Sequence, residues 1–124
     1  MADVSKLRAI ACKAIDSLSG ELHDISREIW KNPEQNFNEV FAHNLLTTYL
    51  KGKGFIVTSE CGGLKTAFRA VFSGNCKQKT PRVGIVCEYD ALPEIDHACG
   101  HNLIAEAGIA AAMGKFCHRQ RSVD

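Results

Sequence analysis

The chain has 124 residues, of which 45% are hydrophobic, 23% charged and 7% aromatic. This length allows one domain at most, and the ordinary composition excludes a disordered, collagen-like or coiled-coil protein. Fifteen basic and fourteen acidic side chains leave a net charge of +1, which excludes the strong positive field of a typical nucleic-acid or anionic-lipid binder.

Helices are expected over the first half of the chain. In the segment 4–31 the apolar residues recur at helical intervals of four, three and four, and they are Leu18, Leu22, Ile25 and Ile29. Ser19-Gly20 is expected to divide this segment into two helices, because glycine costs about 1 kcal/mol inside a helix. Asn32-Pro33 is expected to end it, since the residue before proline avoids the helical conformation.

A further helix is expected over residues 38–51, closed by the glycines at positions 52 and 54. The apolar side predicted for it consists of Val40, Phe41, Leu45 and Tyr49.

Strands are expected in the middle of the chain. A short one is predicted at 55–57, and a second at 66–72, where Phe68, Ala70 and Phe72 alternate on one side. Residues 73–81 are polar and are expected to form a loop. The segment 82–89 is predicted to be a strand that is apolar enough to be buried on both faces.

The last element expected is an alanine-rich helix over about 103–113. The whole pattern predicts an α/β fold, with helices packed on a mixed sheet. Residues 115–124 show no periodicity and are predicted to be a divergent, disordered tail, which leaves 1–114 as the folded part.

Neither a membrane span nor a signal peptide is expected. No segment approaches the roughly 20 apolar residues of a span, and charged residues interrupt the first fifteen positions. We therefore expect a cytoplasmic protein whose six cysteines are reduced thiols, because their spacing is irregular and no CxxC pair occurs.

The most informative segment runs from Glu88-Tyr89-Asp90-Ala91-Leu92-Pro93 to His97-Ala98-Cys99-Gly100-His101-Asn102. Imidazole, thiolate and carboxylate groups are the usual ligands of first-row transition metals. Alternate positions 97, 99 and 101 point the same way in an extended chain, and a turn at Gly100 would also bring Cys99 and His101 to one ion. Asp90 is placed to orient a ligand imidazole.

Two plainer interpretations stay open at this point. A His-x-Cys-x-His cluster also arises by chance, and it contains too few ligands for a closed four-coordinate site. His23 and His43 fall on predicted helices, where solvent exposure is the simpler explanation, and Cys87 is expected to be a small buried strand residue.

The pairing of Asp90-Ala91-Leu92-Pro93 with His97-Ala98-Cys99-Gly100-His101 resembles the M-20 peptidases, a family of di-metal aminoacylases, carboxypeptidases and amidohydrolases. Glu28-Ile29-Trp30 with Asn32-Pro33-Glu34, and the stretch from Gly63 to Ala70, are similar to the same family's opening helix and first-strand region. The likeness covers roughly residues 20–114.

This resemblance implies part of a zinc-peptidase-like catalytic domain, with Cys99 and His101 as metal ligands and Asp90 in support. His97 matches the motif without being a usual ligand, and Asn102 stands where many relatives carry Asp. The implied cofactor is a pair of divalent metals, zinc in the first place, with manganese or cobalt as alternatives. The implied reaction is hydrolysis of the amide bond of dipeptides, with a basic C-terminal residue, or of N-acyl amino acids.

The resemblance also implies parts that the sequence does not contain. The family's glutamate pair, its later histidine ligands and its dimerisation domain have no counterpart, since the only carboxylates after Asn102 are Glu106 and Asp124. We therefore expect a truncated form that lacks a general base and several ligands. The alternatives are a catalytically inactive isoform with no enzymatic role of its own and a small metal- or redox-sensing module using Cys99 and His101.

Overall fold

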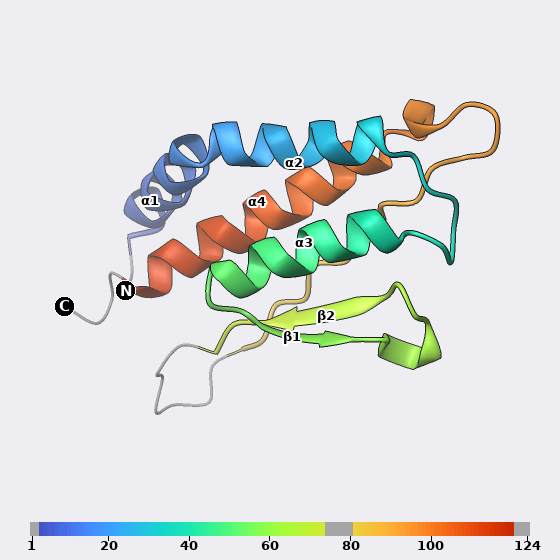
Figure 1. Cartoon of the computed structure of the whole chain (residues 1–124). Helices are drawn as coiled ribbons and strands as arrows, with labels where there is room; N and C mark the ends of the chain where they lie inside the picture. Colours follow the sequence, from blue (N-terminus) through green and yellow to red (C-terminus); the bar gives the residue numbers. More distant parts are fainter. Residues whose placement is uncertain (1–2, 74–80, 121–124) are drawn as a thin grey trace.

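The computed structural model describes residues 3–73 and 81–120, with side chains described as far as Lys115. Four helices pack together, and α3 lies against a small two-stranded sheet while α2 and α4 pack beyond it (Figure 1). The elements in chain order are α1 (Val4–Ser17), α2 (Ser19–Lys31), α3 (Val40–Gly52), β1 (Ile56–Ser59), η1 (Cys61–Gly63), β2 (Phe68–Val71), η2 (His97–Cys99) and α4 (His101–Gln120). The expected α/β class is confirmed.

One residue from nearly every turn of three helices forms the core. These side chains recur at intervals of three or four, so each helix turns a single stripe inward. The core residues are Leu22, Ile25 and Ile29 of α2, Ala42, Leu46 and Leu50 of α3, and Ala105, Ile109 and Met113 of α4. The inward stripe predicted for the segment 4–31 is therefore confirmed for α2, and Leu18 packs against its edge.

The division of the first helical segment is also confirmed, with the break at Leu18, one residue before the predicted position. The side chain of Asp3 begins α1 by accepting hydrogen bonds from the backbone N–H groups of Ser5 and Lys6, at 3.0 and 3.4 Å. Such a cap satisfies donors that have no partner within the helix. Asn32 ends α2, as the following proline predicts.

The apolar side predicted for the third helix is wrong in part. Val40 and Phe41 remain exposed, at 58% and 37% of their surface, whereas Ala42 and Leu46 are buried. Leu45 and Tyr49 lie at the margin of the core. The buried face of α3 therefore runs through Ala42, Leu46 and Leu50.

The strands β1 and β2 pair antiparallel, with Ile56 opposite Val71 and Ser59 opposite Phe68. The strand predicted at 66–72 is confirmed over four residues, and its alternation holds, because Phe68 and Ala70 turn toward the helices. The first strand begins one residue later and runs two residues further than expected. Among the described residues the sheet is antiparallel rather than mixed.

The buried strand predicted at 82–89 is wrong. This segment is extended but pairs with no strand among the described residues, and Val83 and Val86 are 71% and 94% exposed. Only one side is covered: Ile85 and Cys87 lie against Gly108 of α4. An apolar run becomes a buried strand only when neighbouring strands and a second layer cover it, and the described part of the chain supplies neither.

The last helix runs to Gln120, seven residues beyond its predicted end. The predicted divergent tail therefore begins inside α4, and its last four residues lie outside the described chain, as does nearly all of the predicted loop 73–81. That residues 1–114 form the folded part of a catalytic domain stays a prediction. None of the described helices is both long and apolar enough to cross a membrane.

Candidate functional site

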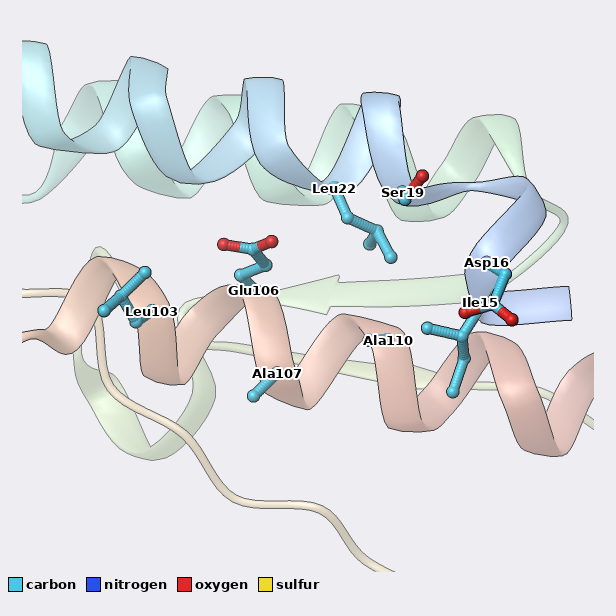
Figure 2. Close-up of a pocket in the computed structure, with 8 residues that line it drawn as sticks. All are labelled: Ile15, Asp16, Ser19, Leu22, Leu103, Glu106, Ala107 and Ala110. Carbon is cyan, nitrogen blue, oxygen red and sulfur yellow. The ribbon is translucent and has the colours of Figure 1, made fainter. Parts of the chain in front are cut away.

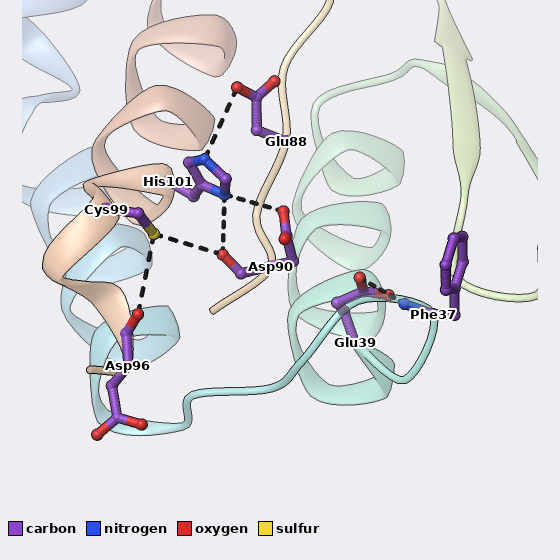
Figure 3. A network of polar contacts seen from close by, with 7 residues as sticks. All are labelled: Phe37, Glu39, Glu88, Asp90, Asp96, Cys99 and His101. Atoms are coloured by element: carbon purple, nitrogen blue, oxygen red, sulfur yellow. Dashed lines mark hydrogen bonds and ion pairs between the residues drawn. The ribbon is translucent and has the colours of Figure 1, made fainter. Parts of the chain in front are cut away.

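The loop between the extended segment and α4 positions the candidate site. Its backbone reverses direction in a tight turn, where Leu92 and Asp96 exchange hydrogen bonds of 2.9 and 3.0 Å. The short helix η2 follows and ends at Gly100, whose φ of 80° lies in the left-handed region that favours glycine. This turn at Gly100 separates Cys99 from His101 and lets both side chains approach Asp90 (Figure 3).

The contact between His101 and Asp90 defines the state of the imidazole. Nδ1 of His101 lies 2.9 Å from both the backbone oxygen and the carboxylate Oδ1 of Asp90. Both oxygens are acceptors at neutral pH, so Nδ1 must carry the hydrogen and donate it. The lone pair of neutral His101 therefore lies on Nε2, the nitrogen left to bind a metal or a proton.

Cys99 joins the same cluster through its thiol. Its Sγ lies 3.7 Å from the backbone oxygen of Asp90 and 3.8 Å from that of Asp96 (Figure 3). The carboxylate of Glu88 lies 3.9 Å from Nε2 of His101. The structure thus brings the three predicted site residues Asp90, Cys99 and His101 together, all of them partly accessible to solvent.

His97 lies in the same loop but points into the protein. It is only 5% exposed. Burial lowers the pKa of His97, and the neighbouring His101 lowers it further. His97, which matches the motif without being a usual ligand, is therefore buried, whereas Cys99 and His101 are partly accessible to solvent.

The described residues supply only part of a donor set. No group of three His, Cys, Asp or Glu side chains in the described ranges converges as a metal site requires. Cys99 and His101 have the donor chemistry of a zinc site, and the supporting Asp90 fits it as well. They fit as a portion of a site that needs further ligands.

A hydrogen-bonded network beneath the loop escaped the sequence analysis. The hydroxyl of Tyr89 donates to the backbone oxygen of Thr66, and the hydroxyl of Thr66 donates to the carboxylate of Glu39. Glu39 and Thr66 are 7% and 8% exposed. No local pattern reveals these partners, which lie 23 and 27 residues apart in sequence.

A hollow among the described residues lies elsewhere. It has a volume of about 250 Å³ between α1, α2 and α4, and neither Cys99 nor His101 lines it (Figure 2). Its wall is mostly apolar, with Asp16 and Glu106 as the acidic members. Glu106, the first carboxylate after the motif, therefore belongs to a different part of the surface.

Comparison with known proteins gives a consistent result, although no family model matches the chain. The chain is 42% identical to the Xaa-Arg dipeptidases of Mus musculus and Homo sapiens, over alignments of 120 and 121 positions that cover 91% and 90% of its length. It is 33% identical to one component of the p-aminobenzoyl-glutamate hydrolase of Escherichia coli (strain K12), over an alignment of 117 positions that covers 81% of its length. The chain spans only about a quarter of these relatives, 28%, 27% and 24% of their lengths.

Proposed function

Since this chain is similar to members of the M-20 peptidase family over most of its length, we propose that it carries part of the active site of a metal-dependent hydrolase. The proposed reaction is cleavage of the amide bond in dipeptides or in N-acyl amino acids. The names of the relatives support this substrate class, because one kind is an Xaa-Arg dipeptidase and the other is part of a p-aminobenzoyl-glutamate hydrolase. The higher identity to the first favours a basic C-terminal residue.

The observation that carries the proposal is the contact of Asp90 with Nδ1 of His101, which leaves the lone pair of neutral His101 on Nε2, together with the approach of the Cys99 thiol to the backbone oxygen of the same Asp90. A ligating histidine that donates its other nitrogen to a carboxylate is the usual arrangement at protein metal sites. We propose Cys99 and His101 as ligands of zinc, with manganese or cobalt as alternatives, and Asp90 as the residue that orients His101.

A bound divalent metal would polarise the scissile carbonyl and lower the pKa of a bound water. The chain's own contribution is to hold the imidazole in one orientation and one tautomer, and to present a thiol that becomes a thiolate ligand on losing its proton. Each ion needs about three protein ligands, and no group of three donor side chains converges within the described residues. The proposal therefore assigns catalysis to a longer protein that supplies the remaining groups.

A second candidate is a form that is catalytically inactive by itself. It is supported by the absence of three converging donor side chains within the described ranges. Loss of a general base alone typically costs about 10²–10⁴-fold in rate. Both candidates make the same prediction for residues 1–124 tested alone, and they differ for an extended protein.

The test compares the 124-residue chain with a chimera in which the rest of the human Xaa-Arg dipeptidase sequence follows residue 114. Both are assayed on β-alanyl-lysine with added zinc, manganese or cobalt. We expect no turnover above background from the short chain and metal-dependent turnover from the chimera. Cys99→Ala or His101→Ala should abolish that turnover, whereas Cys12→Ala, at an exposed thiol of α1, should preserve it.

Two results would contradict the proposal. One is a folded chimera that takes up metal and does not hydrolyse the dipeptide, which would favour the inactive form. The other is unchanged turnover in Cys99→Ala and His101→Ala, which would exclude these residues as ligands.

A further inference from the structure

Asp90 is held in place from both sides by its neighbours in the chain. On one side Tyr89 stacks its ring on Phe68, with centroids 6.1 Å apart, and donates its hydroxyl to the backbone oxygen of Thr66. On the other side the N–H of Ala91 donates to the backbone oxygen of Glu34 at 2.7 Å. The backbone of Asp90 is therefore held in place by the contacts of its neighbours Tyr89 and Ala91.

The segments that Tyr89 and Ala91 contact are themselves held by two carboxylates, those of the buried Glu39 and the partly buried Glu34. Glu39 accepts hydrogen bonds from the hydroxyl of Thr66 and from the N–H of Phe37, the latter at 2.9 Å. Glu34 accepts from the first two N–H groups after the start of α3, those of Phe41 and Ala42, at 2.8 and 3.0 Å. An acidic side chain at the N-terminus of a helix is favoured by the helix dipole. The position of Asp90 is thereby tied to the beginning of α3.

The anchor through Tyr89 matters because the preceding segment is poorly held. Within the described ranges, no hydrogen bond from backbone to backbone involves residues 82–90. The bond from Tyr89 to Thr66 is thus the last polar contact before Asp90. Burial raises the pKa of the Tyr89 hydroxyl, so this group stays a hydrogen-bond donor at neutral and mildly alkaline pH.

We propose that Tyr89, Thr66 and Glu39 are positioning residues, which hold Asp90 where it keeps the hydrogen of neutral His101 on Nδ1. This inference deepens the proposed function. The relevance of the network to metal binding rests on that function, since only this tautomer presents Nε2 as a ligand atom. Release of Asp90 leaves the imidazole free to place its hydrogen on Nε2, which blocks ligation at that nitrogen.

The test is nitrogen NMR of the 15N-histidine-labelled chain at pH 8.5, where an ordinary imidazole is neutral. The signal of His101 is assigned by its loss in His101→Asn. In Tyr89→Phe, which keeps the aromatic ring, we expect the ratio of the Nδ1–H to the Nε2–H tautomer of His101 to fall about fivefold, as for the loss of one ordinary hydrogen bond. Tyr49→Phe is the matched control, because Tyr49 is the other tyrosine of the chain and lies on α3 away from this loop.

The middle member of the network is tested in the same way. Thr66→Val removes the hydroxyl that reaches Glu39 and should lower the tautomer ratio, whereas Thr66→Ser keeps the hydroxyl and should restore it. A role confined to general stability would move the unfolding midpoint without this dependence on the hydroxyl.

An unchanged ratio in Tyr89→Phe would overturn the inference, and so would an equal fall in Tyr49→Phe. Cobalt(II) titration of the same variants separates this inference from the proposed function. Absence of a cobalt–thiolate absorption band in the parent chain would count against the metal site and would leave the NMR result decisive for the network. If the band forms, Tyr89→Phe should weaken cobalt binding by up to about fivefold, because affinity falls with the population of the Nδ1–H tautomer.

Discussion

At the scale of single residues, polar side chains at the base of the loop do the positioning. Asn102 follows the candidate ligand His101 and is buried, at 6% exposure. Its amide donates to the hydroxyl of Ser26 at 3.0 Å and to the backbone oxygen of the same residue at 3.4 Å. The start of α4 is thereby attached to α2. The position at which many relatives are expected to carry Asp is thus a buried donor facing acceptors, which suits Asn.

Asn102→Ala should lower the free energy of unfolding by about 1–3 kcal/mol, because it leaves a buried hydrogen-bond partner unsatisfied. Ser26→Ala and the double variant complete a cycle, from which we expect a coupling of about 0.5–1.5 kcal/mol. Urea unfolding of the four proteins gives the energies. Strictly additive effects would mean that the contact contributes nothing.

At the scale of elements, the extended segment 82–89 depends on a glycine of α4. A Cβ at Gly108 would lie 2.8 Å from Sγ of Cys87 and 3.7 Å from Cγ2 of Ile85. The first distance is shorter than real contacts allow, so the segment or the helix would have to move. Burial raises the pKa of the Cys87 thiol, in agreement with its close packing against the helix.

Gly108→Ala tests this contact. Alanine is favoured over glycine in a helix by up to about 1 kcal/mol, but overpacking costs about 1–3 kcal/mol, so we expect a net loss of about 1 kcal/mol in the free energy of unfolding. Gly20→Ala is the control, because nothing lies within 4 Å of a Cβ there, and it should not destabilise the chain. Cys87→Ala added to Gly108→Ala should recover part of the loss. An increase in stability for Gly108→Ala would show that the segment moves away without cost.

At the scale of the whole molecule, two partly buried tyrosines link stability to pH. Burial raises the pKa of both Tyr49 and Tyr89 above the ordinary value near 10, and the carboxylates of Glu21 and Glu39, respectively, add to it. A group whose pKa is raised on folding favours its neutral form in the folded protein. Its contribution to stability is complete below about pH 10 and is lost as the pH rises further.

We therefore expect the free energy of unfolding to fall steadily as the pH rises above about 10, measured by urea unfolding from pH 8 upward. The double variant Tyr49→Phe/Tyr89→Phe should start from a lower stability at pH 8 but decline less steeply above pH 10. An identical decline in parent and variant would assign the alkaline effect to other groups, such as the lysines.

Features that depend on near neighbours in the chain could be predicted from the order of the amino acids. The helical stripe of Leu22, Ile25 and Ile29 is confirmed, because its spacing alone places those side chains on one face. The cluster of Cys99, His101 and Asp90 was expected from a motif of twelve residues, in which the left-handed turn at Gly100 allows the approach. The roles of these three residues stay predictions.

Features that join distant segments could not be predicted in this way, because they arise from packing. The link from Asn102 to Ser26 spans 76 residues, and the network through Thr66 joins Glu39 to Tyr89. Which polar groups meet across such separations depends on how helices and loops pack, which no local pattern encodes. The exposure of 82–89 has the same origin, because its apolar sequence favours a buried strand but burial requires neighbours. Ile85 and Cys87 lie against α4 and Tyr89 lies against Phe68, whereas Val83 and Val86 stay exposed.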